Sequence, residues 1–404
     1  MCYEVVVVGA GPAGATAAKF LAEKGKKVLL LDKDTFPRDK PCGGGLSIRT
    51  IKRFNYISTD LLASYSFDGM IHSPSHKYQV QLHKDDPIAA FVHRTEFDYG
   101  LLQYAIERGT TFLEGNTATD IRILPDKVKI KINNTEYVDS QLVVGADGIW
   151  STIAKKTGLG HHYQQTGRCL FQEFSLSSNV LDDYFTEKRV FHFHLRFMGM
   201  NGYGWVFPKK TSVNIGVGEI KPSISTRAHK PNLKEIYDKY LHFLKERKLI
   251  PPTLAIEKIQ GGILPLQPLQ KTFTDRVILC GDAAGFINPL TGDGIDYAMT
   301  SGKLAAEVCA EALNAGDTHA AFLSKFQRLW KRDFGREITL CSYILKQLLH
   351  STNSEKYVKL VSKDPLIVDM VLTLLDNQGR LSECQWRLMK RFIYLYWKDL
   401  LRLL

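Results

Sequence analysis

Two glycine-marked turns stand near opposite ends of this chain, each directly after an apolar strand. The first follows four consecutive valines and reads Gly9-Ala10-Gly11-Pro12-Ala13-Gly14. The second follows Val277-Ile278-Leu279 and reads Cys280-Gly281-Asp282. A buried β-branched strand that ends in such a turn and continues into a helix is typical of a dinucleotide-binding βαβ unit. We therefore expect both ends of the chain to hold one cofactor.

The spacing within the first turn suits a pyrophosphate. Gly9 permits the tight turn and Gly11 permits close approach of the ligand. Gly14 lets the next helix, expected at residues 15–24, pack closely on the strand. The first N–H groups of that helix then point at the phosphates. The alternative is a glycine-rich turn with a structural role alone.

An acid follows the second expected strand, residues 27–31. Asp32 lies close to the ~20 residues from the turn at which a carboxylate binds the ribose, and an acid there favours a free 2′-hydroxyl. Ala13 and Lys33, which flank these positions, are further candidates for cofactor contact.

Two more turns indicate which dinucleotide is bound. The apolar run Leu142-Val143-Val144 leads into Gly145-Ala146-Asp147-Gly148. The Gly281-Asp282 turn is followed by Asn288-Pro289-Leu290-Thr291-Gly292-Asp293-Gly294-Ile295. A nicotinamide dehydrogenase has no need of this second strand and turn, whereas an FAD protein does. We therefore predict FAD, with Asp147 among its candidate contacts.

With these three signatures the chain resembles, over nearly its full length, the FAD-dependent family that contains aromatic hydroxylases and geranylgeranyl reductases. The resemblance implies that Asp282 binds the ribityl chain. It also implies that Gly292, Gly294 and Ile295 bring backbone N–H groups to the flavin pyrimidine edge. A helix expected at residues 295–313 would stabilise an anionic reduced flavin through its positive N-terminus. The alternative is that the two glycines only make a turn.

The resemblance adds two more cofactor contacts. Arg94, at the start of a helix expected at residues 94–109, matches an arginine that contacts the flavin phosphate or ribityl chain; a surface charge is the alternative. Ala118 stands where the family places a residue that faces the adenine.

The expected fold is α/β: a Rossmann-like FAD-binding domain, an antiparallel-β substrate domain and a helical C-terminal region. The FAD-binding domain is predicted to be discontinuous, and the substrate domain is predicted from short runs of alternating apolar and polar residues rich in aromatics. The predicted boundaries are 1–60, 94–160 and 266–320 for the FAD-binding domain, 61–93 and 161–265 for the substrate domain, and 321–404 for the helical region.

Two motifs resemble those of geranylgeranyl reductases rather than hydroxylases. In Lys40-Pro41-Cys42-Gly43-Gly44-Gly45-Leu46-Ser47 the glycines let the backbone approach a flat ring, and Cys42 could supply a proton. Cys42, Gly43 and Gly45 are therefore candidate flavin contacts; the alternative for Cys42 is a small buried residue. In the second motif Tyr203, Trp205 and Phe207 alternate along a strand, so they form one apolar wall suited to an isoprenoid or to an ordinary core.

The reaction implied is saturation of isolated carbon–carbon double bonds in a geranylgeranyl chain on a lipid or diphosphate. Cys42, Tyr203, Trp205 and Phe207 are the candidate catalytic residues. The external reductant is NAD(P)H or ferredoxin. One alternative is an FAD-dependent aromatic monooxygenase; another is a non-redox escort that binds prenyl lipids, like the Rab GDP-dissociation inhibitors.

The charge and composition of the chain limit the kinds of partner that it can bind. The formal net charge is +11, yet no nucleic-acid module is recognisable, which favours a phospholipid or another phosphate-bearing partner. Residues 382–404 form a basic amphipathic pattern, predicting membrane contact, a packed helix or a partner helix.

Other patterns give expectations about location and metals. Without an apolar run of ~18 residues or a leader before the first strand, we expect a cytoplasmic, intracellular protein, with peripheral contact with a membrane as the alternative. The 7 cysteines lack zinc spacing, so no metal is expected. His192 and His194 share a strand face and are expected to be exposed or hydrogen-bonded.

Overall fold

The computed structural model describes residues 2–160, 163, 165–221, 232–254, 258–349, 351–376 and 390–391. These residues divide into two compact units. The first unit consists of residues 1–40, 94–166 and 263–339, and the second of residues 41–93, 167–262 and 340–404. The predicted α/β fold class is confirmed, with a largely parallel sheet in the first unit and a mostly antiparallel one in the second.

The boundaries of the units differ from the predicted domains in several places, and residues 161–166 and 263–265 of the predicted substrate domain fall in the first unit. Residues 41–60 belong to the second unit, because β3 pairs there with β7. Residues 321–339 belong to the first unit, because Leu323, Phe326, Trp330 and Phe334 join its core. The described residues of the predicted helical region from residue 340 onward fall in the second unit.

The sheet of the first unit has the strand order β17-β18-β11-β1-β2-β8, with β10 and β9 continuing from β11. β1 pairs in parallel with both β11 and β2, because each of these strands is a run of buried aliphatic residues that packs on both faces. Its strands are β1 (Cys2–Val8), β2 (Val28–Leu31), β8 (Thr111–Leu113), β9 (Ala118–Ile123), β10 (Val128–Ile132), β11 (Glu136–Gly145), β17 (Phe273–Thr274) and β18 (Val277–Leu279).

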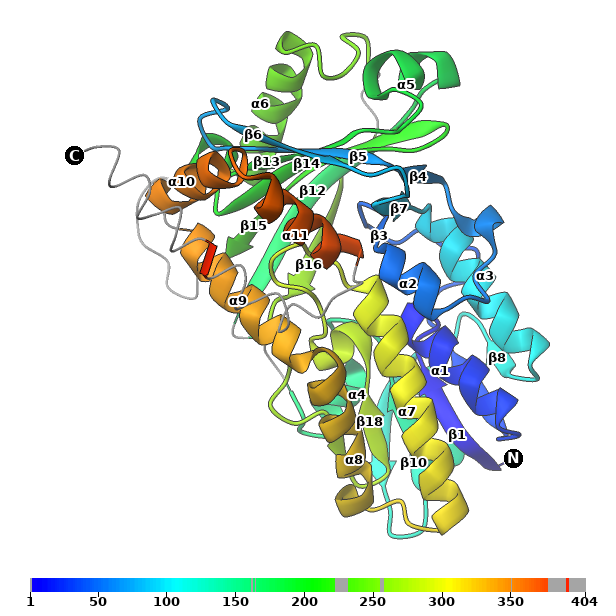
Figure 1. Ribbon diagram of the computed structural model, residues 1–404. Helices are drawn as coiled ribbons and strands as arrows, with labels where there is room; N and C mark the ends of the chain where they lie inside the picture. The colour runs from blue at the N-terminus through cyan, green and yellow to red at the C-terminus, as the bar shows by residue number, and fades with distance from the viewer. Residues whose placement is uncertain are drawn as a thin grey trace. The chain divides into compact units, whose positions relative to one another are not determined.

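Two helices lie side by side against this sheet, and Figure 1 shows them as α1 in blue and α7 in yellow. They approach so closely because Gly302 of α7 faces the backbone of α1: a Cβ there would lie 2.2 Å from the carbonyl oxygen of Ala13. The helices of the unit are α1 (Pro12–Glu23), α3 (Arg94–Glu107), α4 (Thr152–Lys156), η3 (Gly281–Ala284), α7 (Ile295–Ala315), α8 (Ala320–Trp330) and the π-helical turn η4 (Lys331–Gly335).

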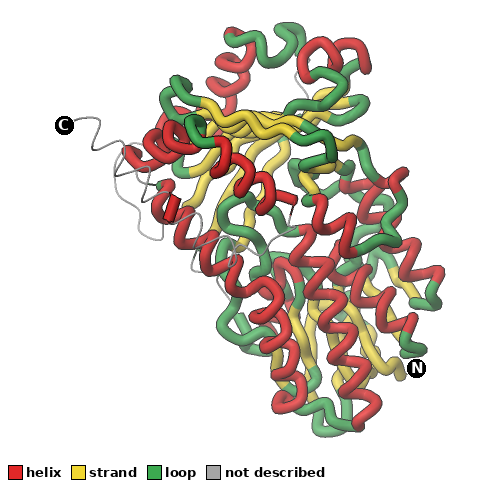
Figure 2. Tube along the Cα trace, viewed as in Figure 1, coloured by secondary structure: helices red, strands yellow, loops and turns green. Residues whose placement is uncertain are grey.

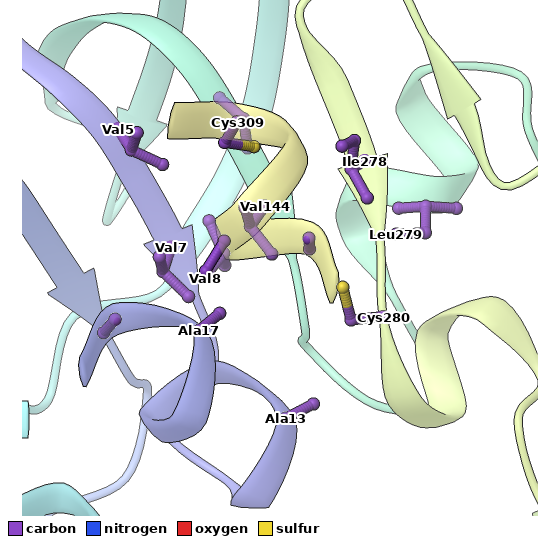
Figure 3. Packing of buried hydrophobic residues seen from close by; sticks show 14 of the residues in the cluster. Val5, Val7, Val8, Ala13, Ala17, Val144, Ile278, Leu279, Cys280 and Cys309 are labelled. Carbon is purple, nitrogen blue, oxygen red and sulfur yellow. The ribbon is translucent and has the colours of Figure 1, made fainter. Parts of the chain in front are cut away.

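The core of the first unit forms where these helices meet the sheet. Figure 3 shows valines of β1 with Val144 of β11, Ile278 of β18, Ala17 of α1 and Cys309 of α7, all buried. Small side chains on the helices let the backbone come close to the strands, which fixes the glycine turns at the ends of β1 and β18. The core therefore positions both predicted cofactor turns.

The second unit contains a seven-stranded sheet of order β16-β12-β15-β14-β13-β5-β6 and a three-stranded sheet of order β3-β7-β4. Figure 2 shows the strands of both units in yellow. The strands of the second unit are β3 (Gly45–Leu46), β4 (Ser64–Ser66), β5 (Asp68–His72), β6 (Gln79–His83), β7 (Ala89–Phe91), β12 (Thr166–Ser175), β13 (Phe191–Leu195), β14 (Gly202–Pro208), β15 (Ser212–Lys221) and β16 (Gln260–Pro265). The first residue of β12 and the last three of β16 are assigned to the first unit.

Helices cover both faces of the larger sheet. On one face α6 buries Tyr237, Tyr240 and Leu244 against Val206 and Ile215. On the other face the helices α10 and α11 contribute to a cluster with Phe91 and Phe191. The helices are α2 (Ile48–Arg53), η1 (Thr59–Leu61), α5 (Ser178–Phe185), η2 (Phe197–Gly199), α6 (Leu233–Glu246), α10 (Ser351–Val361) and α11 (Pro365–Asp376), while α9 (Arg336–Leu348) spans the boundary between the units.

Candidate functional site

The first glycine turn has the geometry that its sequence predicts. Gly9 has a φ of +99°, and a Cβ there would lie 2.3 Å from the carbonyl oxygen of Ala146. A Cβ on Gly14 would lie 1.7 Å from the carbonyl oxygen of Gly9. Neither position can carry a side chain, so both glycines are structurally required. Gly11 caps α1, and a Cβ there would lie 3.4 Å from Nη2 of Arg38, its one near neighbour among the described residues.

Asp32 closes this turn from the end of β2. Its Oδ2 accepts a hydrogen bond from the N–H of Ala10 at 2.6 Å, and its Oδ1 accepts one from the N–H of Asp34 at 2.9 Å. The residue is only 7% exposed. The acid is therefore held beside the turn, where the sequence predicts a ribose contact. The side chain of Lys33 is 69% exposed, with its Nζ 3.4 Å from Oδ1 of Asp34, and its predicted cofactor contact stays a prediction.

Arg38, which the sequence analysis did not single out, faces the same turn. Its Nη2 lies 3.0 Å from Oδ2 of the fully buried Asp98. Its Nη1 is buried and has no hydrogen-bond partner among the described residues. A buried guanidinium nitrogen beside a glycine-lined helix N-terminus is suited to an anionic ligand. The place of Arg38 six residues after Asp32 is no recognised motif, so the sequence alone gives no signal for it.

Arg94 shares Asp98 with Arg38. Its Nε and Nη2 donate to the two carboxylate oxygens of Asp98, each at 2.7 Å. This fork-like pair fixes the guanidinium within α3. The Arg94 side chain is 11% exposed, so it is largely buried, and its predicted flavin contact stays a prediction.

The second glycine turn meets the first. Gly281 has a φ of +56°, and a Cβ there would lie 3.0 Å from Cβ of Ala13 in α1. The structure thus brings together the two turns that are most distant in sequence.

Asp282 is surrounded by groups from three segments. A Cβ on Gly294, at the start of α7, would lie 3.7 Å from its Oδ1. Burial raises the pKa of Asp282, and the positive charges of Lys40 and Arg94 oppose that rise. The carboxyl group is therefore held among polar groups at the end of β18, as a ligand-binding acid would be.

In the loop before α7, two backbone N–H groups already donate hydrogen bonds to acceptors within the loop itself. Gly292 has a φ of +73° and donates its N–H to the carbonyl oxygen of Asn288 at 2.8 Å. The N–H of Ile295 donates to Oδ1 of Asp293 at 3.2 Å. The predicted flavin contacts of Gly292, Gly294 and Ile295 stay predictions, and contact at Ile295 would require Asp293 to release that N–H group.

Asp147 caps a helix in this structure. Its Oδ1 accepts from the hydroxyl of Ser151 at 2.5 Å and its Oδ2 from the N–H of Ile153 at 3.1 Å. Burial raises the pKa of Asp147, while these hydrogen bonds oppose the rise. Its predicted cofactor contact stays a prediction.

Tyr163 is a second residue that the sequence analysis missed. Its hydroxyl donates to the carbonyl oxygens of Asp282, at 2.6 Å, and Ala283, at 3.0 Å. Burial raises its pKa, and the negative charges of Asp282 and Asp147 raise it further. No sequence motif includes this tyrosine, so only the folded chain shows that its hydroxyl is hydrogen-bonded to the backbone of the second turn.

Ala118 is buried at the start of β9, within the core of the first unit. Its predicted contact with adenine stays a prediction.

The residues of the first unit fit an FAD pyrophosphate. Gly9 and Gly14 bring the backbone to the start of α1, Gly11 leaves space there, and Arg38 offers a buried N–H donor with no partner in the part of the chain that the structure describes. Asp32 is held by backbone N–H groups where the sequence predicts a ribose contact, and Asp282 lies by the second turn; both contacts stay predictions.

The Pro-Cys-Gly motif packs on the aromatic strand within the second unit. A Cβ on Gly43 would lie 3.1 Å from Cε2 of Phe207 and 3.2 Å from Nε1 of Trp205. Gly44 has a φ of +77°, and its N–H donates to Sγ of Cys42 at 3.3 Å. Gly45 pairs with Phe91 of β7. The two reductase-like motifs, about 160 residues apart in the sequence, therefore form one structure.

Tyr203, Trp205 and Phe207 lie on one face of β14, as the alternation predicts. The ring centroids of Tyr203 and Trp205 are 6.0 Å apart, and those of Trp205 and Phe207 are 6.1 Å apart. Phe193 of β13 packs on the same face, with its ring centroid 5.1 Å from that of Tyr203 and 5.4 Å from that of Phe207. These four residues are named the aromatic face below.

An open hollow of about 470 Å³ lies in the second unit between β6 and α11. Val80, Val368 and Leu372, which line it, belong to the same apolar cluster as Phe193 and Phe207. The aromatic face thus continues into apolar surface beneath the C-terminal helices.

His192 and His194 of β13 are expected from the sequence to be either exposed or hydrogen-bonded. Both are buried and hydrogen-bonded. Nδ1 of His192 lies 3.0 Å from Nε2 of His72, and Nδ1 of His194 lies 2.8 Å from the hydroxyl of Tyr240. Burial is the main cause that lowers the pKa of His192 to about 3 and that of His72 to about 4. Among the described residues no cluster of His, Cys, Asp and Glu has the arrangement of a metal site.

The amphipathic pattern at residues 382–404 lies outside the described residues, apart from Lys390 and Arg391. Within the described ranges, no helix combines the length and apolar character needed to cross a bilayer.

Comparison with known proteins identifies a family and several relatives of this chain. The family described as FAD binding domain matches residues 2–325. Digeranylgeranylglycerophospholipid reductase 1 of Methanopyrus kandleri is 30% identical over 403 residues, which cover 96% of this chain and 100% of that protein. Digeranylgeranylglycerophospholipid reductase of Methanococcus vannielii is 31% identical over 334 residues, covering 81% of this chain and 82% of that protein.

Among solved structures, the chain is similar to a geranylgeranyl bacteriochlorophyll reductase-like protein from Thermoplasma acidophilum. The TM-score is 0.80 at 25% identity, and the match covers 95% of this chain and 98% of that chain.

Proposed function

Because this chain belongs to the FAD-binding domain family, in the group that contains the digeranylgeranylglycerophospholipid reductases, we propose that it saturates isolated double bonds in the geranylgeranyl chains of a glycerophospholipid. The observation that carries the proposal is the packing of the Cys42–Gly45 turn on Trp205 and Phe207. This turn and this aromatic face are the two motifs that separate prenyl reductases from hydroxylases of the same fold.

FAD, when bound and reduced, supplies a hydride for an alkene carbon. An isolated alkene has no carbonyl group to polarise, so the protein must act by orienting the chain, excluding water and tolerating positive charge. The faces of Tyr203, Trp205 and Phe207 meet the last two needs, because aromatic faces are apolar and attract cations. Cys42, held by the N–H of Gly44, is the candidate that gives a proton to the second carbon.

The charge distribution supports an anionic lipid. The first unit has 23 lysines and arginines and 23 aspartates and glutamates. The second unit has 30 and 19, so its sequence accounts for the whole formal charge of +11. A cationic substrate unit raises the local concentration of phosphate-bearing ligands. A geranylgeranylated glycerophospholipid agrees with this charge and with the names of the relatives, whereas a diphosphate agrees with the charge alone.

Two parts of the proposal concern partners. The electron donor is NAD(P)H or ferredoxin. Peripheral contact with a membrane surface, including contact through residues 382–404, would bring the enzyme to a lipid substrate.

The test is mass spectrometry of a digeranylgeranyl glycerophospholipid after anaerobic incubation with the FAD-loaded protein and dithionite. We expect mass gains in steps of two hydrogens, and none when dithionite is omitted. No gain, with rapid reoxidation of the flavin in air that a phenolic ligand stimulates, would instead identify an aromatic monooxygenase. Lipid binding without any redox change would identify a prenyl-lipid escort.

A further inference from the structure

A polar network lies beside the aromatic face within the second unit. Glu173 of β12, Ser212 and Asn214 of β15, and Lys209, directly after β14, meet where these three neighbouring strands run side by side. Oε2 of Glu173 accepts from Nζ of Lys209 at 2.9 Å and from Nδ2 of Asn214 at 2.7 Å. Its Oε1 accepts from the hydroxyl of Ser212 at 2.5 Å. One carboxylate therefore gathers three donors.

Asn214 connects this carboxylate to the indole of Trp205. The indole Nε1–H donates to Oδ1 of Asn214 at 2.8 Å, and the amide Nδ2 of Asn214 donates to Glu173. Asn214 is fully buried and Trp205 is 6% exposed. Because an ionised carboxylate only accepts hydrogen bonds, Glu173 fixes which end of the amide faces the indole.

Lys209 connects the same carboxylate to the glycine turn. Its side chain is 2% exposed, and its Nζ lies 3.3 Å from the position that a Cβ on Gly44 would occupy. The carbonyl oxygen of Gly44 accepts from the N–H of Val92 at 2.8 Å, which ties the turn to the residue after β7. The network thus touches both motifs of the proposed reductase site.

The charge state of Glu173 is set by this environment. Burial acts to raise its pKa, but the charge of Lys209 and the hydrogen bonds of Ser212, Asn214 and Lys209 outweigh burial and leave the pKa lowered. The Lys209 side chain is 2% exposed and that of Glu173 is 31% exposed, so the lysine loses nearly all of its hydration, and burying a charge in this way is a poor source of stability compared with apolar packing. This network therefore calls for an explanation other than stability.

We propose that Glu173, Asn214 and Lys209 are positioning residues that fix the plane of the Trp205 indole and the Gly43–Gly44 turn for reduction of the prenyl chain. The inference rests on the proposed function and deepens it. Neither Glu173 nor Lys209 reacts: Glu173 acts through Asn214 on the indole, and Lys209 acts on the backbone that carries Cys42.

The decisive variant is Glu173→Gln. A glutamine can donate to Oδ1 of Asn214, which lets the amide reverse and presents its NH₂ group to the indole N–H. Two donors would then face each other, so the indole must turn away. Lys210→Met is the matched control, because Lys210 is the adjacent lysine and its side chain is exposed.

The first readout is the ¹⁵N–¹H spectrum of the indole groups in protein labelled on its 5 tryptophans. Trp205→Phe identifies the signal of residue 205. We expect E173Q to shift or broaden that signal and K210M to leave it in place. This readout needs no substrate, so it is separate from the test of the proposed function.

The second readout is kinetic. E173Q is expected to lower kcat for the geranylgeranyl lipid about 10- to 100-fold, with KM within about threefold of wild type, because misplacement of about 1 Å costs a similar factor. The double variant E173Q/K209M removes both charges; we expect it to fold like wild type and to stay slow, which a purely structural ion pair would not predict.

An unchanged Trp205 signal in E173Q, or a kcat equal to that of K210M, would overturn the positioning role. If wild-type protein reduces no geranylgeranyl lipid, the proposed function fails and the catalytic part of this inference fails with it. A shifted Trp205 signal in that case would assign the network to structure alone.

Discussion

The backbone N–H of Ala10 and the carboxylate of Asp32 are joined by a 2.6 Å hydrogen bond that links the first glycine turn to the end of the neighbouring strand. A second N–H group, from Asp34, binds the other oxygen of the same carboxylate. The acid is therefore fixed in place by the backbone of its own surroundings. Preorganisation of this kind lowers the entropic cost of binding a ribose hydroxyl.

Replacement of this acid should weaken FAD binding. Asp32→Ala removes a charged hydrogen-bond acceptor for the ribose and the acceptor for Ala10, and hydrogen bonds to charged groups contribute about 1.5–3 kcal/mol. We expect the Kd for FAD to rise about 10- to 100-fold. Titration followed by flavin fluorescence measures it, with Asp126→Ala, an exposed acid in the β9–β10 turn, as the control. Equal affinities of the two variants would remove Asp32 from the cofactor site.

Arg38 should also contribute to FAD binding, through its guanidinium group. Arg38→Met removes the buried Nη1 donor that has no partner among the described residues, while Arg94 still pairs with Asp98. We expect about a tenfold increase in the Kd for FAD, since a charge-assisted hydrogen bond to phosphate is lost. Isothermal titration calorimetry checks it, with Arg108→Met as the control because Arg108 is 56% exposed. Wild-type affinity in R38M would show that this guanidinium serves only Asp98.

Gly302→Ala tests the close contact between α1 and α7. In an open helix interior this change would raise the free energy of unfolding by about 0.5–1 kcal/mol. Here the new Cβ would lie 2.2 Å from the carbonyl oxygen of Ala13 and 3.2 Å from the backbone nitrogen of Ala17, so it must push two backbones apart. We expect a destabilisation of about 1–3 kcal/mol, as overpacked cores show. Urea unfolding measures this change, and its sign decides: a higher free energy of unfolding for G302A than for wild type would contradict the contact.

The sequence predicts the first unit well because its signals are local. A strand, a glycine turn, a helix and an acid follow one another within residues 2–32, and the structure places α1 at Pro12–Glu23 and β2 at Val28–Leu31. The helix expected at residues 295–313 is α7, Ile295–Ala315. The strand alternation likewise places Tyr203, Trp205 and Phe207 on one face. Periodicity and turn chemistry are sufficient for features of this kind.

What the sequence could not predict depends on contacts between distant segments. Arg38 has no motif, and its role follows from Asp98, 60 residues later, which it shares with Arg94. Tyr163 and Glu173 stand in stretches with no recognisable signature and gain meaning only from Asp282 and Asn214. Side-chain partners brought together by sheet order leave no periodic trace in one sequence.

A group of four histidines in the second unit should make stability depend on pH. The ring of His72 stacks on that of His194 with centroids 4.2 Å apart, and His192 and His76 lie beside them. The pKa of each is lowered, mainly by burial; other charges near His76 are Arg247, which lowers its pKa, and Glu355, which raises it. The folded protein therefore keeps these rings neutral where the unfolded chain is protonated.

The sign follows from proton linkage. Below the unfolded pKa of 6.5 the unfolded chain binds protons that the folded state does not bind, so the free energy of unfolding falls as pH decreases. Each fully buried histidine contributes a slope of about 1.4 kcal/mol per pH unit until pH reaches its folded pKa, which is about 3 for His192. We expect His192→Leu to reduce the slope between pH 6.5 and 5 by about that amount in urea unfolding. His242→Leu is the control, because His242 is exposed on α6, and equal slopes in the two variants would show that His192 is protonated in the folded protein as readily as in the unfolded chain.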